Sequence, residues 1–416
     1  MATGANVRRV FLIVLALIGC GFLCWQIFRH RPADLTVYLA GAQALLDGKP
    51  VYESVAIPSG TLILPFTYPP FAAVVMIPFA LLPFPATLLI WALLSLASLA
   101  GIAYLTAARL PFLAGITRSP WPTWQLALGI FVISAFSEPI IQNFDLGQVN
   151  LMIVVAVLYD TVSRTRYAGF ATGIAAGFKV TPGLFMIFML VTKRWADFGR
   201  AVLGFAVTLV IGSFFGLGQV WQYWTVELFA TDRVGNPRRY SNLGISGVLQ
   251  RSLSSNTATA IWIGCAAVLI VAVLWMAAIW WTRSKLISAT LVGMATVLVS
   301  PISWPHHWVW LVPGVACAIA LAIRAFRQGE GKVGWPLAIG ATVTGIPALI
   351  QLRFHVLEIM LAANAPGISF VSALYAAGGV LLVVALGVGA RLITRDEGTS
   401  DDLPPADNAT GVAAGA

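Results

Sequence analysis

Apolar residues occur along this chain in long runs that are separated by shorter polar segments. A helix that crosses a bilayer needs about 20 consecutive and mostly apolar residues. The candidate runs are 10–28, 86–107, 124–136, 149–162, 200–217, 257–281, 286–303, 306–325, 334–350 and 367–390. The pattern therefore predicts an all-α polytopic membrane protein.

Two further apolar segments are irregular. The segment 71–82 is short and has prolines on both sides, which predicts a re-entrant or interfacial helix. The segment 168–192 is interrupted by Lys179-Val180-Thr181-Pro182. Proline interrupts helical hydrogen bonding, and irregular backbone is tolerated at membrane depth where it lines a cavity. We expect two half-helices that meet at a loop, and about 12 hydrophobic segments in all.

Three polar segments complete the predicted organisation. The segments 29–69 and 218–256 combine charged and aromatic residues with few flexible runs, so we expect folded outer loops. The last segment, 392–416, is acidic and rich in small residues, which predicts a disordered cytoplasmic tail. The membrane domain is then 1–391.

Composition and charge agree with a membrane location. Of the 416 residues, 59% are hydrophobic and 10% are charged, whereas soluble domains carry about 25% charged residues. The net charge of +9 does not indicate a nucleic-acid partner, because membrane proteins retain Lys and Arg on the cytoplasmic side. With the N-terminus inside and both irregular segments re-entrant, most basic residues fall on that side. Treating those segments as single spans moves Arg164 and Arg166 outside and Asp145 inside.

Asp34 is the first candidate for chemistry, because it lies shortly after the first apolar run, at the outer face. Aspartate before Leu-Thr-Val-Tyr is typical of a helix N-cap. A carboxylate at this place can also accept a proton from a hydroxyl as a general base. One residue can do both.

Lys179 is the second candidate. A charged ammonium inside an apolar segment costs several kcal/mol and needs an anionic partner, such as a lipid phosphate or Asp145. Snorkelling of the side chain to an interface is the alternative. The nearby polar residues Asp145, Gln148 and Asn150 either line a cavity or form an ordinary turn around Gly147.

The segment 301–308 brings two imidazoles and two indoles into an apolar stretch. Trp304 and Trp308 could stack on sugar rings or lie at the headgroup level. His306 and His307 point about 100° apart on a helix, so they do not share one role or one metal ion. The four cysteines have no metal-ligand spacing either. The basic segment 232–251 either binds an anionic lipid or sugar acceptor or is a solvated loop.

Five stretches in order along the chain resemble glycosyltransferase family 87, in the GT-C superfamily of polyprenyl-phosphate-sugar-dependent transferases. They are Asp34 to Tyr52, Phe66-Thr-Tyr-Pro-Pro-Phe71, Gly147-Gln-Val-Asn150, Gly177-Phe-Lys-Val-Thr-Pro182 and Ser300-Pro-Ile-Ser-Trp-Pro-His-His-Trp-Val-Trp310. The resemblance implies a GT-C-like bundle in the plasma membrane whose active site faces the outer, periplasmic side.

The activity implied by this resemblance is transfer of mannose from polyprenyl-phosphate-mannose to a glycolipid of the phosphatidylinositol mannoside or lipomannan type. The expected product has an α-(1→2) linkage, formed with inversion and without cofactor or metal. Asp34 corresponds to the catalytic base, and His306 or His307 to the histidine beside the donor phosphate. The expected substrate-binding residues are Lys179, Asp145, Gln148, Asn150, Tyr68, Trp304 and Trp308.

Two other functions remain open from the sequence. An arabinofuranosyltransferase would use a polyprenyl-phosphate-arabinose donor, and a flippase of lipid-linked sugars would use the same cavity and Lys179 but would not need Asp34. One motif also differs from the family pattern. This chain has Asn242-Leu-Gly-Ile-Ser246 where members often have Asn-Gln-Ser, so the resemblance assigns no role to Asn242.

Overall fold

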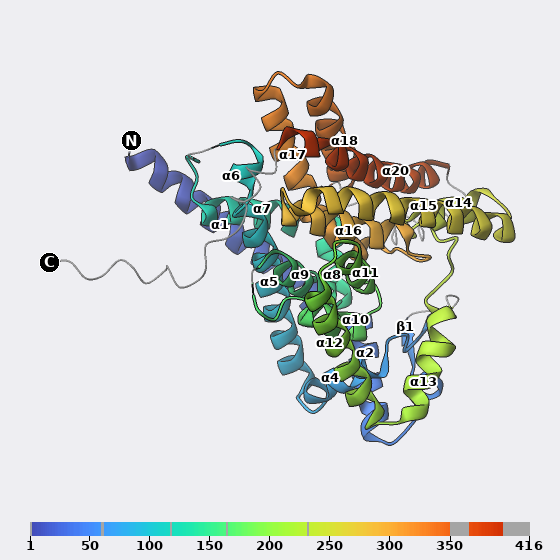
Figure 1. Ribbon diagram of the computed structural model, residues 1–416. Coiled ribbons are helices and arrows are strands. Elements are labelled where there is room, and N and C mark those ends of the chain that lie inside the picture. The colour runs from blue at the N-terminus through green and yellow to red at the C-terminus, as the bar shows by residue number, and fades with distance from the viewer. Residues whose placement is uncertain are drawn as a thin grey trace.

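The computed structural model describes residues 2–59, 62–116, 119–163, 165–230, 233–349 and 366–393. These residues are mostly helical (Figure 1). Within them, one antiparallel hairpin of β1 (Ala56–Ser59) and β2 (Leu62–Pro65) departs from the all-α prediction. The predicted tail, except for its first two residues, lies outside the described residues.

Each predicted apolar run forms a helix. In chain order the helices are α1 (Ala2–Phe28), α5 (Phe84–Ala107), α7 (Thr123–Ala135), α9 (Asn150–Val162), α12 (Trp195–Ser213), α15 (Ser255–Trp281), α16 (Lys285–Val299), η3 (Pro305–Trp310) with α17 (Leu311–Arg327), α18 (Gly331–Leu349) and α20 (Pro366–Val388). The short elements α6 (Leu110–Leu113), α8 (Glu138–Leu146) and η4 (Gly389–Leu392) follow α5, α7 and α20.

Six described stretches are long and apolar enough to cross a bilayer: Asn6–Phe28, Phe84–Leu113, Trp195–Ser213, Ser255–Trp281, Pro305–Arg327 and Ser372–Leu392. The number rises to seven if α7 and α8, which meet at 71°, form one bent span. Other apolar helices, such as α9 and α16, have only 10–17 residues. The chain is thus a multi-pass membrane protein, whereas the figure of about 12 segments is not confirmed as a number of spans.

Both irregular segments form the short helices that the sequence indicated. The first is α4 (Pro70–Ala80), a short helix that packs against the outer-loop helix α2 (Ala33–Leu46). The second consists of α10 (Phe170–Phe178) and α11 (Gly183–Val191), with Lys179 in extended backbone between them. The break predicted at Lys179 is therefore confirmed.

The two segments predicted as outer loops, called the first and second outer loops below, are folded, as predicted. The first contains α2, α3 (Val51–Ser54) and the β1–β2 hairpin, and the second contains α13 (Leu217–Thr225), η1 (Glu227–Phe229) and α14 (Ile245–Ser252). In Figure 1, α2, β1 and α13 lie together at the lower right, away from the N-terminal end of α1.

Helices α10 and α12 are in very close contact because glycines leave room for it. A Cβ atom added at Gly173 would lie 2.0 Å from the backbone oxygen of Ala201, and one at Gly177 would lie 1.9 Å from Oγ1 of Thr208. Small residues four apart allow membrane helices to approach in this way. This contact fixes the half-helix that ends at Lys179.

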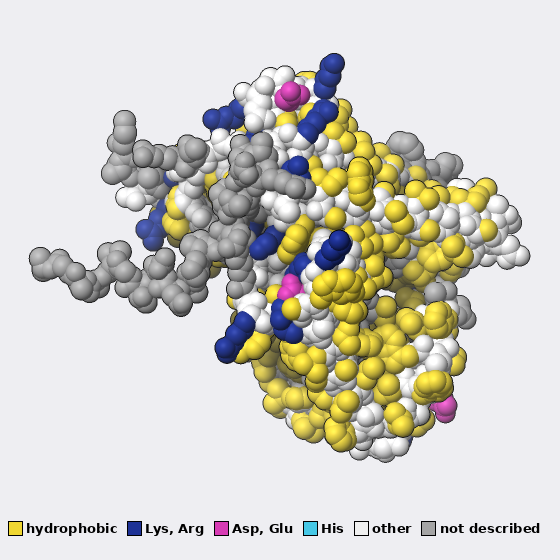
Figure 2. Space-filling model, viewed as in Figure 1, with side chains coloured by type: hydrophobic (Ala, Val, Ile, Leu, Met, Phe, Trp, Pro, Cys, Tyr) yellow, Lys and Arg dark blue, Asp and Glu magenta, His cyan; other side chains and the backbone are white. Residues whose placement is uncertain are grey.

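Apolar and basic side chains occupy different parts of the visible surface. Figure 2 shows apolar side chains over much of the visible face, with Lys and Arg mainly in the left half, where α1 begins. Few basic side chains appear at the right, near α13 and α14. The asymmetry agrees with retention of basic residues on the cytoplasmic side.

Candidate functional site

Asp34 lies in the first turn of α2 but does not cap the helix. The N-cap residue is Pro32, in extended backbone, and no side chain bonds to the free N–H groups of α2. Instead, Oδ2 of Asp34 accepts a hydrogen bond from Nε2 of Gln148 at 2.8 Å. The N-cap interpretation of Asp34 is therefore wrong, and no donor among the described residues bonds to its Oδ1.

A continuous chain of amides connects Asp34 to Lys179. The side chain of Asn150 donates to Oε1 of Gln148 at 3.4 Å, and Nζ of Lys179 donates to Oδ1 of Asn150 at 2.8 Å. The hydroxyl of Tyr38 also donates to Oε1 of Gln148, at 3.0 Å. The chain thus brings a carboxylate and an ammonium, far apart in sequence, to the two ends of one polar cluster.

Gly147 allows this cluster to form. It ends α8 in the left-handed conformation, with φ 67°, which suits glycine because it has no Cβ. A Cβ here would also lie 2.6 Å from Cβ of Leu35. The backbone of the α8–α9 turn therefore contacts the start of α2 directly, and Nε1 of Trp91 holds the turn by donating to the Gly147 oxygen at 3.0 Å.

Lys179 has a neutral partner and an aromatic neighbour. Besides Asn150, its Nζ lies 5.6 Å from the ring centroid of Tyr68, a cation–π contact. The proposed pairing with Asp145 is wrong, because Asp145 bonds to Arg29 and to His30 on the α1–α2 connection. Snorkelling is also excluded here, because the ammonium points into the polar cluster.

The surroundings of Asp34 make its carboxyl a weaker acid than usual. Burial raises the pKa of Asp34 to about 6, although the hydrogen bond from Gln148 and the charge of Lys179 lower it. A carboxyl with a pKa near the working pH is well suited to general-base catalysis.

A pocket opens beside Lys179. Its polar residues are Asn150, Lys179, Thr181, Thr296, Ser300 and His307, and its apolar residues include Ile153, Val157, Phe185 and Trp310. His307 lines this pocket, whereas His306 is 5% exposed and contributes its backbone oxygen to Asn143 and Asn150. Asp34 lies outside the lining and is connected to it through Gln148 and Asn150.

The two candidate tryptophans differ in their surroundings. Trp304 is half-buried and is close to Gly235 of the second outer loop. Trp308 is fully buried, with its ring 5.5 Å from that of Tyr375. In this structure Trp308 has no exposed face for a sugar, and it packs against Tyr375 of α20.

Asn242 is a residue to which the sequence assigned no role. Its Oδ1 accepts from the backbone N–H of Ser303 at 2.9 Å, and its Nδ2 donates to the oxygens of Pro237 and Pro301, each at 3.0 Å. The fully buried amide therefore joins the second outer loop to the loop that precedes His306 and His307. The position of Asn242 in a family motif is the sequence feature that pointed to it.

Tyr38 was also missed, although helical spacing indicates it. Residues four apart on a helix share a face, and Tyr38 lies four after Asp34. Its hydroxyl reaches both Gln148 and, at 3.2 Å, the hydroxyl of Tyr68. The side chain thus connects the Asp34 end of the cluster to the Lys179 end.

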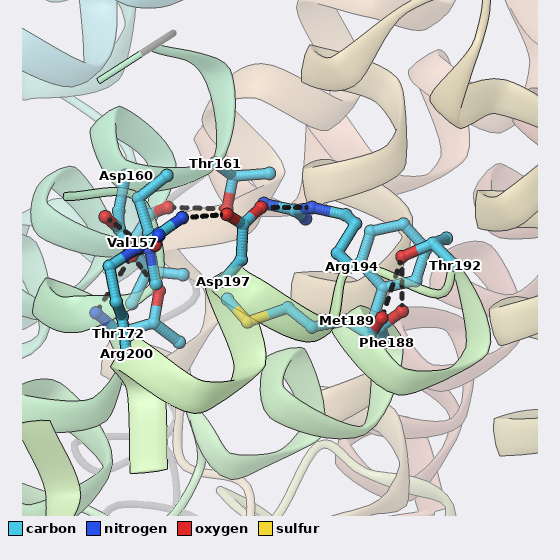
Figure 3. A network of polar contacts seen from close by, with 12 residues as sticks. Val157, Asp160, Thr161, Thr172, Phe188, Met189, Thr192, Arg194, Asp197 and Arg200 are labelled. Atoms are coloured by element: carbon cyan, nitrogen blue, oxygen red, sulfur yellow. Dashed lines mark hydrogen bonds and ion pairs between the residues drawn. The ribbon is translucent and has the colours of Figure 1, made fainter. Parts of the chain in front are cut away.

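A second polar network lies where α9, α10, α11 and α12 meet (Figure 3). Both carboxylate oxygens of Asp160 accept from the backbone N–H of Gly169, at 3.0 and 2.9 Å, and Oδ2 also accepts from the N–H and hydroxyl of Thr172. Asp197 forms ion pairs with Arg194 and Arg200. These acids are paired within the protein and leave little for a ligand.

No group of three or more His, Cys, Asp and Glu side chains that could hold a metal ion occurs within the described ranges. The polar groups at the pocket are instead amides, hydroxyls, an imidazole and an ammonium. This set suits a phosphate or sugar better than a cation, because most of its members can donate hydrogen bonds.

Residues 66–301 match the family model of glycosyltransferase family 87. The chain is also 31% identical, over 75% of its length and 76% of the relative's, to the polyprenol-phosphate-mannose-dependent alpha-(1-2)-phosphatidylinositol mannoside mannosyltransferase of Mycobacterium tuberculosis (strain ATCC 25618 / H37Rv). It is 36% identical, over 83% of its length and 84% of the relative's, to the polyprenol-phosphate-mannose-dependent alpha-(1-2)-phosphatidylinositol pentamannoside mannosyltransferase of Mycolicibacterium smegmatis (strain ATCC 700084 / mc(2)155).

Proposed function

Because the chain belongs to glycosyltransferase family 87 and is a polyprenol-phosphate-sugar-dependent glycosyltransferase, we propose that it moves mannose from polyprenyl-phosphate-mannose to a phosphatidylinositol mannoside or lipomannan acceptor. The product has an α-(1→2) linkage. The observation that carries this proposal is the cluster with Asp34 at one end and Lys179, beside the pocket, at the other.

The reaction is a single displacement. The acceptor hydroxyl attacks the anomeric carbon, the bond from that carbon to the phosphate oxygen breaks, and polyprenyl phosphate leaves with the electron pair. Oδ1 of Asp34 takes the hydroxyl proton, since Oδ2 is already bonded to Gln148. Attack opposite the leaving group inverts the anomeric centre, so a β-linked donor gives an α product.

The leaving phosphate lies at the pocket beside Lys179 and His307. Negative charge grows on its oxygens as the bond breaks, and donors fixed in a site with little water stabilise such charge strongly. Lys179 supplies a positive charge that forms no direct ion pair with a carboxylate of the described residues and bonds instead to Asn150. The apolar residues Ile153, Val157 and Phe185 of the same pocket suit the start of the isoprenoid chain.

Tyr68, Asn150 and Gln148 hold the charged groups in place, and Trp304 lies near enough to the second outer loop to contact an acceptor sugar. His307 is the histidine beside the donor phosphate, because His306 is buried and lies outside the pocket lining. Asp145 acts through its ion pair with Arg29, on the segment that leads to Asp34, and not on a substrate.

The site belongs on the outer side of the plasma membrane. The uneven distribution of Lys and Arg on the visible face supports this orientation, because few basic side chains appear near α13 in that view (Figure 2). Mannose is favoured over arabinofuranose because the names of the relatives specify polyprenol-phosphate-mannose. A flippase would not need the hydrogen-bonded carboxyl of Asp34.

The test is transfer by purified protein in nanodiscs. Radiolabelled polyprenyl-phosphate-mannose is mixed with phosphatidylinositol mannosides, and the lipids are separated on thin layers and treated with a linkage-specific α-mannosidase. We expect a labelled α-(1→2) product from the parent protein and almost none from Asp34→Asn. Transfer from polyprenyl-phosphate-arabinose alone, or movement of donor across vesicles with no glycosidic bond formed, would contradict the proposal.

A further inference from the structure

The second outer loop exposes a group of large apolar side chains. The exposed fractions are 81% for Phe214, 72% for Leu217, Trp221 and Phe229, and 57% for Val226. These five residues, called the α13 face here, lie at the C-terminal end of α12, on α13 and on η1. Large apolar side chains that are exposed this close together in sequence mark a surface that meets a partner.

The α13 face is continuous with a surface that contacts lipid. Helix α12 is a candidate span that ends at Ser213, and its side chains Leu203 and Val210 are both 56% exposed. The chain then turns at Gly216, with φ 134°, and α13 starts at Leu217. The apolar surface of α12 thus passes into the α13 face at the point where the chain leaves the span.

We propose that the α13 face inserts into the boundary between headgroups and acyl chains of the leaflet on the side of the active site. Amphipathic helices with Trp, Phe and Leu on one face lie in this boundary, and aromatic rings are enriched there. The partner is the lipid surface itself. A second copy of the chain is less favoured, because the exposed residues continue without a break from a spanning helix.

The opposite face of α13 holds the first outer loop. Oε1 of Gln219 accepts from the backbone N–H of Val51 at 2.7 Å, and the ring of Tyr223 stacks on that of Tyr52 at 6.0 Å and 25°. The hydroxyl of Tyr52 donates to the backbone oxygen of Tyr68 at 2.8 Å. The ammonium of Lys179 in turn lies over the ring of Tyr68.

A chain of contacts therefore leads from the bilayer to the site. Insertion of the α13 face fixes α13, and α13 fixes Val51 and Tyr52, which hold the strand-to-helix connection that carries Tyr68. The effect of this anchor on transfer rests on the proposed function, whereas the insertion itself does not. The two are tested by separate measurements.

Insertion is measured with a fluorescent label on a single cysteine. Cys20, Cys24, Cys265 and Cys317 are replaced, and either Trp221→Cys or the control Lys49→Cys is added. Lys49 lies in the same outer region, and its side chain is 60% exposed and paired with Asp47. The labelled protein is placed in nanodiscs with brominated lipids, and iodide serves as the quencher in water.

We expect brominated lipid to quench the label at 221 strongly and iodide to quench it little, with the reverse at 49. Strong quenching by iodide at 221 overturns the proposal, because the face is then in water. Protection from both quenchers overturns it as well, because another protein surface then covers the face.

The consequence for the site is measured with Leu217→Asp combined with Trp221→Asp, and with Trp221→Phe as the conservative variant. In nanodiscs, we expect the Asp pair to raise KM for the donor, with Trp221→Phe close to the parent. If the label shows insertion but the Asp pair transfers normally, the connection to Tyr68 is wrong while insertion stands. If even the parent transfers nothing, the proposed function fails and the quenching result is unaffected.

Discussion

Two buried polar networks in this protein use the same kinds of side chain in opposite ways. In the network around Asp160 and Asp197, the acids meet N–H groups, a hydroxyl and two guanidinium groups of the protein (Figure 3). In the cluster between Asp34 and Lys179, neutral amides separate the two charges. The first is complete without a ligand, whereas the second has charge at both ends that a substrate can use.

The difference shows what identifies a site inside a membrane protein. Burial of charge alone does not, because both networks bury it at a cost. What separates them is the pairing of the charges. Both carboxylate oxygens of Asp160 already accept hydrogen bonds from the protein, whereas Oδ1 of Asp34 has no donor among the described residues.

The largest effect is expected from removing the base. Asp34→Asn preserves the shape of the side chain and its contact with Gln148, but an amide cannot take the acceptor's proton. We expect transfer to fall by about 10²–10⁴-fold with little change in donor binding. The matched control is Asp160→Asn, which should keep transfer near the parental rate in protein that remains folded. Equal losses of transfer in both variants would remove the contrast.

The second largest effect is expected from removing the ammonium of Lys179. Lys179→Ala should weaken donor binding by about 2–5 kcal/mol, the range for truncating one partner of a buried charge pair. Binding of polyprenyl-phosphate-mannose to protein in nanodiscs measures it. Lys49→Ala, which removes an exposed lysine, serves as the control and should bind normally. Unchanged affinity in Lys179→Ala would mean that the phosphate lies elsewhere.

In the network around Asp160, we expect a substitution to lower stability and to leave substrate binding unchanged. Asp160→Ala leaves the N–H groups of Gly169 and Thr172 without their acceptor, and each buried donor left unsatisfied costs about 1–3 kcal/mol. Thermal unfolding of the purified protein should show a lower midpoint, with KM unchanged in the protein that remains folded. A raised KM with normal stability would indicate that Asp160 contributes to the substrate site.

The smallest effect concerns pH. The base must be ionised, and the pKa of Asp34 is about 6, so kcat/KM should rise with pH up to about 6 and level off above it. Gln148→Glu replaces the donor at Oδ2 with a second carboxyl, and this raises the pKa of Asp34. The rise should then move to higher pH, while Asp160→Asn leaves the midpoint in place. A midpoint that Gln148→Glu does not move would assign the titration to another group.

The sequence predicted the helices well because hydropathy alone determines where apolar segments lie. It also predicted the break at Lys179, since a lysine and a proline in one apolar segment conflict with a continuous helix. The β1–β2 hairpin was not expected, because Pro58 and Pro65 are unfavourable in strands. The number of spans could not be derived either, because short helices such as α9 have the same composition as longer ones.

Residue types in the site were predictable, but their partners were not. The bond from Gln148 to Asp34 joins residues 114 positions apart, and the bond from Ser303 to Asn242 joins residues 61 apart. Such contacts depend on tertiary packing, which no local pattern contains. The same reason explains Trp308. From the sequence alone, a tryptophan in an apolar motif can equally well contact a sugar or pack in the core, because the sequence does not show which face of its helix is buried.

The glycine contact between α10 and α12 has a consequence for how relatives of this enzyme can diverge. One wall of the pocket comes from the break after α10. Gly173 of α10 meets the backbone of Ala201, and Gly177 meets the side chain of Thr208, so a larger residue at either glycine would displace that wall. Another part of the lining comes from Thr296, Val297 and Ser300, at the C-terminal end of α16, and consists of side chains rather than glycines in close helix contact. Changes in preference for the donor's lipid chain should therefore accumulate on the α16 wall, while the α10 wall stays constant.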